Sequence, residues 1–238
     1  MSINSKNILI VGGSGALGSA LIQSFSELSW NVAATFHDRT KHSVAPCEWV
    51  HMDLRQSTSI KTAVEQSAKL FGSLHAVIHA GGVTRDQPLV KMNLNEWNEA
   101  LDVNLKSAFL LAKACYSHLI QSPLSHLVLV GSMAGKAGHP GQSNYVAAKA
   151  GLMSLCQSLA REWGERGVCV NTIWPGVMHS KMTASLSEAR LEELKKSNAL
   201  GRLSDPSETA KFIAFLVANM SQVSGQCFNL DSRIHSWT

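Results

Sequence analysis

Tyr145 and Lys149 are the residues of this chain whose types and spacing point most directly to chemistry. They are four residues apart at the start of a predicted helix, so their side chains lie on one helical face. A tyrosine hydroxyl has an ordinary pKa of about 10, and a nearby ammonium group favours the phenolate and lowers that pKa. The pair therefore predicts a phenol that Lys149 tunes to act as a general acid in the reduction of a ketone.

Ser132 lies thirteen residues before Tyr145, at the end of the predicted strand that closes with Val130-Gly131. In an open parallel sheet, ligands bind beyond the carboxyl ends of the strands, so this strand end and the helix start converge on one crevice. A serine hydroxyl there can hold a carbonyl oxygen through a hydrogen bond that strengthens as negative charge develops. Taken singly, these residues also suit a half-buried aromatic, a surface cation and a turn. The set favours catalysis.

A glycine-rich turn follows the first predicted strand, with the sequence Val11-Gly12-Gly13-Ser14-Gly15-Ala16-Leu17-Gly18. Small residues allow the backbone to approach a pyrophosphate, and the free N–H groups at the start of the next helix face its negative charge. Tight turns also use glycine for steric reasons alone. Its place between the first strand and the first helix predicts a dinucleotide site.

The end of the second predicted strand bears on which nicotinamide cofactor is used. Phe36 occupies the tip and is followed by His37, Asp38, Arg39 and Lys41. An acidic residue at the tip would bind the adenosine ribose hydroxyls, whereas a cation accommodates a 2′-phosphate. The absent tip carboxylate and the three following cations favour NADPH over NADH. Asp38 argues the other way, and a solvated loop remains an alternative interpretation.

Short apolar runs alternate with segments of helical period along the whole chain. Strands are predicted at 7–11, 32–36, 48–51, 76–80, 126–130, 168–173 and 226–230, and helices at 16–28, 57–71, 95–120, 143–163 and 206–220. Strands that are apolar throughout are expected where helices cover both faces of a parallel sheet. The pattern predicts a single α/β domain over residues 1–238. It is a doubly wound (Rossmann) fold with a mostly parallel seven-stranded sheet and a mobile, polar and helical substrate flap at about 176–205.

Composition excludes several other classes of protein. The 238 residues are 45% apolar and 16% charged, and no apolar stretch approaches the roughly 20 residues that cross a bilayer. The start of the chain has no basic and apolar leader, and five scattered cysteines suggest free thiols, so a cytoplasmic location is expected. Ten histidines show no metal-ligand spacing, and the net charge of +4 contains no run of Lys or Arg. Neither a metal site nor nucleic-acid binding is expected.

Longer strings carry a resemblance to a known family. They include Gly82-Val83-Thr84-Arg85-Asp86, Asp102-Val103-Asn104-Leu105, Gly141 to Leu152, Ser158-Leu159-Ala160-Arg161-Glu162, Pro175-Gly176 and Gly201-Arg202. With the glycine turn and the Ser/Tyr/Lys set, the chain resembles a short-chain dehydrogenase/reductase over essentially its whole length. Within that superfamily it is most similar to 3-oxoacyl-[acyl-carrier-protein] reductases.

The resemblance implies a catalytic tetrad of Asn104, Ser132, Tyr145 and Lys149. In the family, the asparagine helps to hold a water through which the lysine passes protons, and the lysine also binds the nicotinamide ribose. Asp53-Leu54 resembles the segment that meets the adenine ring, and residues 175–180 resemble the stretch that fixes the carboxamide. The expected cofactor-binding residues are Gly12, Ser14, Gly15, Leu17, Gly18, His37, Arg39, Asp53, Leu54, Ala80, Gly81, Gly82, Tyr145, Lys149, Pro175, Gly176, Met178 and Ser180.

The resemblance also implies partners. The family is commonly tetrameric through the helices that carry Asn104 and Tyr145, so a homo-tetramer or dimer is expected. Its members dock an acidic acyl carrier through basic residues near the mouth of the active site. Arg166 matches one such position, whereas the other is Pro123 here. The loss of a rim charge would mainly slow association with the carrier.

Several positions depart from the family pattern. Gly15 stands where NADPH-preferring members often have arginine, and Val11 replaces a threonine before the turn. His79-Ala80-Gly81-Gly82 replaces Asn-Asn-Ala-Gly, which alters the local bracing of the backbone, and Asp231-Ser232-Arg233 replaces a pair of glycines.

Three hypotheses about function follow. The first is NADPH-dependent reduction of a 3-oxoacyl thioester, linked to acyl carrier protein or to CoA, to the 3-hydroxyacyl product. The second keeps the chemistry and changes the substrate to a sugar, steroid-like or pterin-like ketone. The third is a non-catalytic dinucleotide-binding subunit.

Overall fold

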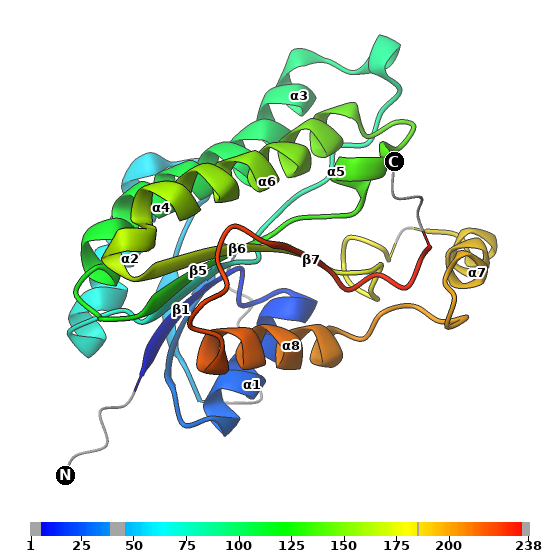
Figure 1. The fold of residues 1–238 in the computed structure, drawn as a ribbon. Coiled ribbons are helices and arrows are strands. Elements are labelled where there is room, and N and C mark those ends of the chain that lie inside the picture. Colours follow the sequence, from blue (N-terminus) through cyan, green and yellow to red (C-terminus); the bar gives the residue numbers. More distant parts are fainter. Residues whose placement is uncertain (1–5, 39–45, 185, 235–238) are drawn as a thin grey trace.

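Seven strands form one sheet at the centre of the molecule (Figure 1). The computed structural model describes residues 6–38, 46–184 and 186–234. Its strands are β1 Asn7–Val11, β2 Asn31–Phe36, β3 Glu48–His51, β4 Ala76–His79, β5 Ser125–Val130, β6 Val168–Trp174 and β7 Cys227–Asn229. They lie in the order β3-β2-β1-β4-β5-β6-β7, and every neighbouring pair is parallel. The predicted fold class is confirmed, with an entirely parallel sheet.

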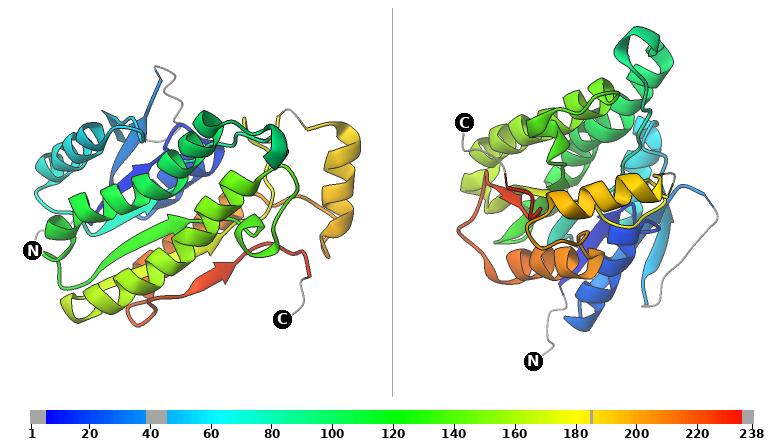
Figure 2. Two further views of the ribbon diagram at one scale, coloured as in Figure 1. Left: turned by 90° about the horizontal axis from the view of Figure 1, so that it is seen from above. Right: turned by 90° about the vertical axis from the view of Figure 1, so that its right-hand side faces the viewer.

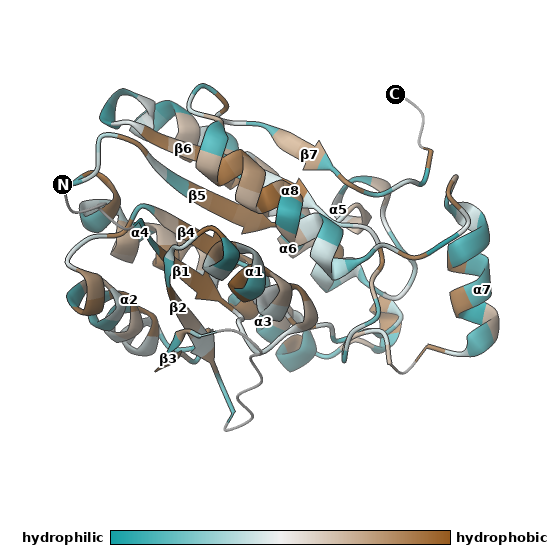
Figure 3. Ribbon diagram, turned by 90° about the horizontal axis from the view of Figure 1, so that it is seen from below, coloured by the Kyte–Doolittle hydropathy of each residue, from teal (hydrophilic) through white to brown (hydrophobic). Residues whose placement is uncertain are grey.

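Helices cover both faces of the sheet. They are α1 Ala16–Glu27, α2 Ser57–Phe71, α3 Leu94–Leu101, α4 Ser107–Leu119, α5 Ala134–Ala137, α6 Ser143–Trp163, α7 Glu188–Ser197 and α8 Pro206–Asn219. On one face α2, α4 and α6 pack against the sheet, and on the other face α1 and α8 lie side by side (Figures 1 and 2). The central strands are buried on both sides and mostly apolar, with a few buried polar residues such as His126 and Asn171 (Figure 3). Continuous apolar runs in the sequence therefore correspond to strands with no face open to water.

The order of the strands places a crevice beside β1. From β1 the chain moves outward through β2 and β3, then returns to β4 on the other side of β1 and continues outward to β7. Two connections thus diverge at the carboxyl ends of β1 and β4, which is where open α/β sheets bind ligands. The backbone N–H of Ala80 donates to the Val11 carbonyl at 2.9 Å and holds these two strand ends together.

The predicted continuous helix at 95–120 is wrong in one respect. A π-helical turn, Asp102–Lys106, separates α3 from α4. A π turn inserts one extra residue into a helix and is frequently found at functional sites. Asn104 lies inside this turn and is fully buried. Sequence periodicity does not report one inserted residue, because the apolar face continues on either side of it.

The polar segment at 176–205 contains α7 and lies beyond the carboxyl ends of the strands (Figure 2). Its base is fixed by a bridge between Met178 and Ser204, and the N–H of Ser204 donates to the Val177 carbonyl at 2.9 Å. The end of α7 is tied to the C-terminal segment by a bridge between Asn198 and Arg233. The helical insertion is confirmed, and its mobility remains a prediction. No helix in the described part of the chain is long and apolar enough to cross a membrane.

Candidate active site

The glycine turn wraps closely around the carboxyl end of β1. Gly12 adopts a φ of +84°, and a Cβ at this position would come within 2.8 Å of the Gly81 nitrogen. The Gly12 N–H donates to the Thr35 hydroxyl at 3.0 Å, which joins the turn to β2. A Cβ on Gly18 would collide with the Gly12 carbonyl oxygen. Glycine is thus required here by close backbone contact, and the turn presents bare backbone to the crevice.

The N-terminus of α1 opens into the same crevice. Its N-cap is Gly15, no side chain caps the helix, and no acidic residue lies in the first turn. The first amides of a helix lack internal partners and carry the positive end of the helix dipole. Together with the backbone of the turn, this end of α1 fits a pyrophosphate. Ser14, Gly15, Leu17 and Gly18 all lie in this segment.

The structure brings the four predicted catalytic residues to one place. The Ser132 hydroxyl lies beside the Tyr145 phenol and favours its ionised form, which lowers the pKa of the phenol. The ammonium Nζ of Lys149 lies 5.7 Å from the centre of the Tyr145 ring and donates to the Val130 carbonyl at 2.9 Å. A Cβ built on Gly82 would come within 2.7 Å of Asn104 Oδ1 and 3.5 Å of Lys149 Nζ, so these two side chains meet beside Gly82.

Asn104 is held rigidly by the backbone around it. Its Nδ2 donates to the carbonyls of Val83 and Ala100, each at 2.8 Å, and its Oδ1 accepts from the Val83 N–H at 3.2 Å. The side chain therefore fixes the π turn to the loop after β4.

Burial shifts the pKa values of the phenol and the amine in opposite directions. It raises the pKa of Tyr145, an effect that the Ser132 hydroxyl reduces and that the carboxylate of Asp86 adds to. Burial also lowers the pKa of Lys149 to about 8. On balance the pKa of Tyr145 is therefore raised rather than lowered, because burial outweighs the groups that favour the phenolate. Tyr145 is 9% exposed, and the loss of solvation raises its pKa by more than the neighbouring groups lower it.

Asn144 is a positioning residue that was not predicted from the sequence. It is fully buried at the start of α6, and its Nδ2 donates to the carbonyls of Arg85 and Glu96 at 2.9 and 3.1 Å. Its Oδ1 accepts from the N–H of Tyr145 at 2.7 Å. The residue therefore fixes the first turn of α6, and with it the backbone of Tyr145. Its place directly before Tyr145 is the signal that could have found it.

At the adenosine end of the crevice, Asp53 follows β3 and is buried. A Cβ on Gly81 would come within 2.6 Å of Leu54 Cδ1, so the Leu54 side chain packs against the loop after β4. Hydrogen bonds from the guanidinium of Arg55, which was not predicted as a site residue, hold the pKa of Asp53 at about 2. His37 lies 3.6 Å from the Asp53 carboxylate. Arg39 and Lys41 lie outside the described residues.

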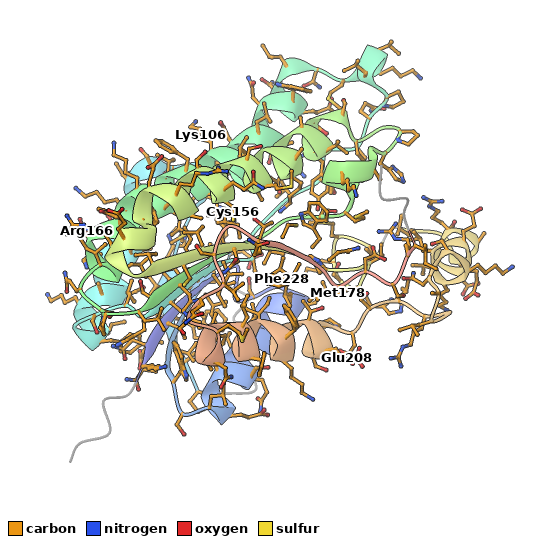
Figure 4. The ribbon with its side chains drawn as sticks, in the orientation of Figure 1. Lys106, Cys156, Arg166, Met178, Glu208 and Phe228 are labelled. Atoms are coloured by element: carbon orange, nitrogen blue, oxygen red, sulfur yellow. The ribbon has the colours of Figure 1, made fainter. Side chains whose placement is uncertain are left out.

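At the other end of the crevice, residues 175–180 follow β6 in a compact turn. Gly176 is buried against Ser204, and the Thr183 hydroxyl accepts from the Ser180 N–H at 2.9 Å and donates to the Met178 carbonyl at 2.8 Å. Met178 and Phe228 of β7 both pack against the core cluster that α1 and α8 cover; both are labelled in Figure 4. This turn borders the crevice from the side opposite Asp53.

Arg166 does not lie at the mouth of this crevice. It is exposed just after the C-terminal end of α6, whereas Tyr145 is in the first turn of that helix (Figure 4). The 21 residues of α6 span about 30 Å. Arg166, the predicted contact for the carrier, is therefore remote from Tyr145 within one chain, because the length of α6 separates the two residues.

The structure shows no group of three or more His, Cys, Asp or Glu residues that could hold a metal within the ranges it describes. Cys115, Cys156, Cys169 and Cys227 are free thiols.

Comparison with known proteins agrees with this geometry. A short-chain dehydrogenase/reductase family model, described as enoyl-(acyl carrier protein) reductase, matches residues 14–234. The chain belongs to the short-chain dehydrogenase/reductase family, whose members are oxidoreductases that bind a nicotinamide dinucleotide.

Relatives with a more specific name cover the chain almost completely. The 3-oxoacyl-[acyl-carrier-protein] reductase FabG of Salmonella typhimurium is 30% identical over 99% of both chains. The protein of the same name from Escherichia coli is 28% identical over 99% of both chains. That from Staphylococcus aureus is 28% identical over 97% of this chain and 98% of its own.

Proposed function

We propose that this protein reduces a 3-oxoacyl thioester to the 3-hydroxyacyl thioester with NADPH. The observation that carries the proposal is the convergence of Ser132, Tyr145, Lys149 and Asn104 on one strand-end crevice, beside a glycine turn and an uncapped helix N-terminus. The relatives named as 3-oxoacyl-[acyl-carrier-protein] reductases support the choice of substrate.

The residues of the crevice fit a nicotinamide dinucleotide. Close backbone contacts require glycine at positions 12 and 18, so no side chain stands there, and the first amides of α1 have no side-chain cap. The bound cofactor supplies a hydride to the substrate carbonyl carbon. Lys149 uses one N–H for the Val130 carbonyl among the described residues, so its other N–H groups are available for the ribose.

The chain's own residues supply the proton and the oxygen binding site. The Ser132 hydroxyl holds the substrate oxygen through a hydrogen bond that strengthens as charge develops on it. Tyr145 donates its hydroxyl proton to that oxygen, and the raised pKa of this phenol keeps it protonated at neutral pH. The charge of Lys149 then stabilises the phenolate that remains. The fixed Asn104 maintains the loop after β4 next to Lys149.

Substitution of Tyr145 tests this function directly. Tyr145→Phe keeps the ring and removes the hydroxyl, so kcat for reduction of acetoacetyl-CoA by NADPH should fall by about 10²-fold or more, since general acid catalysis contributes about 10² to 10⁴. Binding of NADPH, measured by its fluorescence, should be retained. Tyr116→Phe, which alters a tyrosine packed on Trp163 in the core, is the control. Unchanged turnover in Tyr145→Phe contradicts the proposal, and no NADPH oxidation by the unaltered protein with any 3-oxoacyl chain defeats it.

A substrate panel separates the alternatives. The matched family model is described as an enoyl reductase, so a 2-enoyl thioester belongs in the panel beside sugar, steroid-like and pterin-like ketones. The Ser132 and Tyr145 hydroxyls lie together, as protonation of a carbonyl oxygen requires, and this favours C=O over C=C reduction. The highest kcat/KM among these compounds identifies the substrate class. A non-catalytic subunit would turn over none of them.

We further propose that the substrate is presented by an acyl carrier protein or by CoA and that the protein acts as a homo-oligomer in the cytoplasm. Arg166 lies about 30 Å along α6 from Tyr145. Carrier docking at Arg166 therefore requires that a second copy bring its own Arg166 near this crevice. Light scattering of the purified chain measures the number of copies.

A further inference from the structure

The carboxylate of Asp53 is already occupied by the protein itself. Its Oδ1 accepts from the backbone N–H and the Nε of Arg55 at 2.9 and 3.0 Å. Its Oδ2 accepts from Arg55 Nη2 at 2.9 Å and from Gln56 Nε2 at 3.1 Å. The side chain of Asp53 is 8% exposed. With four donors on two oxygens, this carboxylate anchors the Arg55 guanidinium and is not a free acceptor for a ligand.

The guanidinium that Asp53 anchors is half exposed, with 50% of the Arg55 side chain open to solvent. Arg55 Nη2 lies 3.2 Å from His37 Nε2, and the rings of His37 and His51 stack with centres 6.2 Å apart. Nη1 of Arg55 has no hydrogen-bond partner within the described residues. A fixed cation with an open donor thus stands beside two imidazoles.

The position of this group in the fold defines what it would meet. His37 directly follows β2, the strand next to β1 and its glycine turn, and Arg55 reaches it from the end of β3. In dinucleotide-binding sheets, the residue after the second strand faces the 2′-position of the adenosine ribose. A carboxylate there selects a 2′-hydroxyl, and an arginine there accommodates a 2′-phosphate.

We propose that Arg55, anchored by Asp53 and flanked by His37, binds the 2′-phosphate of an adenosine ribose and determines selectivity for the phosphorylated dinucleotide. This inference rests on the proposed function for the presence of a dinucleotide and adds the residue that selects it. The open Nη1 of the guanidinium can donate charge-assisted hydrogen bonds to phosphate oxygens, and its anchored geometry reduces the ordering that binding requires. The cation reaches the ribose from β3, one strand further out than the β2 loop that carries Arg39.

Two nucleotides that differ only in the 2′-phosphate test the proposal. Binding of 2′,5′-ADP and of 5′-AMP to the full chain is measured by titration calorimetry at one ionic strength. The unaltered protein should prefer 2′,5′-ADP. Arg55→Gln should reduce that preference by about ten- to hundred-fold, the effect of one charge-assisted contact, with little change for 5′-AMP. Arg161→Gln, an exposed arginine on α6, is the matched control and should keep the preference.

A second pair of variants separates direct contact from an effect through Asp53. If Arg55 touches the phosphate, the double variant Asp53→Asn with Arg55→Gln should show a smaller preference for 2′,5′-ADP than Asp53→Asn alone. Equal preferences in those two variants would overturn the proposal, as would an unchanged preference in Arg55→Gln or equal binding of both nucleotides by the unaltered protein. Retained 5′-AMP binding shows that each variant is folded. Because neither probe contains nicotinamide, selection of 2′,5′-ADP stands even if no 3-oxoacyl thioester is reduced.

Discussion

Proton transfer in this site requires a protonated phenol, which Tyr145 provides, and a nearby positive charge, which Lys149 provides. Tyr145 is buried and its raised pKa keeps its proton in place at neutral pH, which is the state a proton donor needs. Lys149 is equally buried, and its pKa of about 8 means that its charge is present at neutral pH and lost just above it. The amine, rather than the phenol, is therefore the group whose titration falls within the working range.

This difference predicts the pH dependence of the free enzyme. Below about pH 8 Lys149 is protonated and can stabilise the developing phenolate, and above it the amine is neutral. The kcat/KM for ketone reduction, which reports groups of the free enzyme, should decline as pH rises through about 8. Assays from pH 6 to 10 measure the decline. In Lys149→Arg the guanidinium stays charged, so this limb should disappear. A flat profile to pH 10 for the unaltered protein would contradict the assignment.

At the scale of elements, the π turn between α3 and α4 is tied to the sheet by His79. The Ser107 hydroxyl donates to the Val103 carbonyl at 2.6 Å, and His79 Nε2 lies 2.7 Å from the same oxygen. Since the hydroxyl has one hydrogen, His79 must donate to it. All of these groups are buried, and burial lowers the pKa of His79 to about 3, so the imidazole is neutral. The end of β4 thus holds the turn that contains Asn104.

Substitution of Ser107 should loosen that connection. Ser107→Ala leaves the His79 N–H buried without a partner, which costs about 1–3 kcal/mol, and it frees the turn that positions Asn104. We expect a lower midpoint in urea unfolding and a lower kcat with an unchanged KM. Ser117→Ala makes the same change at an exposed position of α4 and serves as the control. Equal stability of the two variants would show that the His79–Ser107 hydrogen bond does not stabilise the folded protein.

At the scale of the whole molecule, buried histidines couple stability to pH. His79 and His126 lie on the adjacent strands β4 and β5, and burial lowers the pKa of His126 to about 4. Neither ring nitrogen of His126 has a hydrogen-bond partner among the described residues. In the unfolded chain both rings bind protons from about pH 6.5 downward, whereas the folded state resists protonation until a lower pH.

The free energy of unfolding should therefore decrease as pH falls from about 6.5 toward 4. A shift from 6.5 to about 4 at His126 alone corresponds to about 3 kcal/mol. Urea unfolding at pH 7 and pH 5 measures the loss. His126→Leu removes one titrating group and should reduce the difference between the two pH values, whereas His179→Leu, at an exposed position, should not. An identical pH difference in all three proteins would rule out His126 as a cause.

Much of the architecture followed from local patterns in the sequence. The apolar strands, the glycine turn and the helix that begins at Ser143 were predicted within a residue or two of their observed bounds, except for the helix at 95–120. Ser132, Tyr145 and Lys149 could be grouped because a strand end and a helix start face one crevice in a parallel sheet. These features depend on periodicity and short spacing, which the sequence records directly.

Tertiary structure alone decided the features that depend on burial and on contacts between distant residues. The raised pKa of Tyr145 comes from desolvation, which no spacing reports. The His79–Ser107 contact joins residues 28 positions apart, and the Arg55–His37 contact joins residues 18 positions apart. Arg166 is remote from Tyr145 because a straight helix separates them. The sequence by itself determined which chemical groups the molecule has and which element carries each. Folding determined their solvation and their neighbours, because both depend on how separate elements pack.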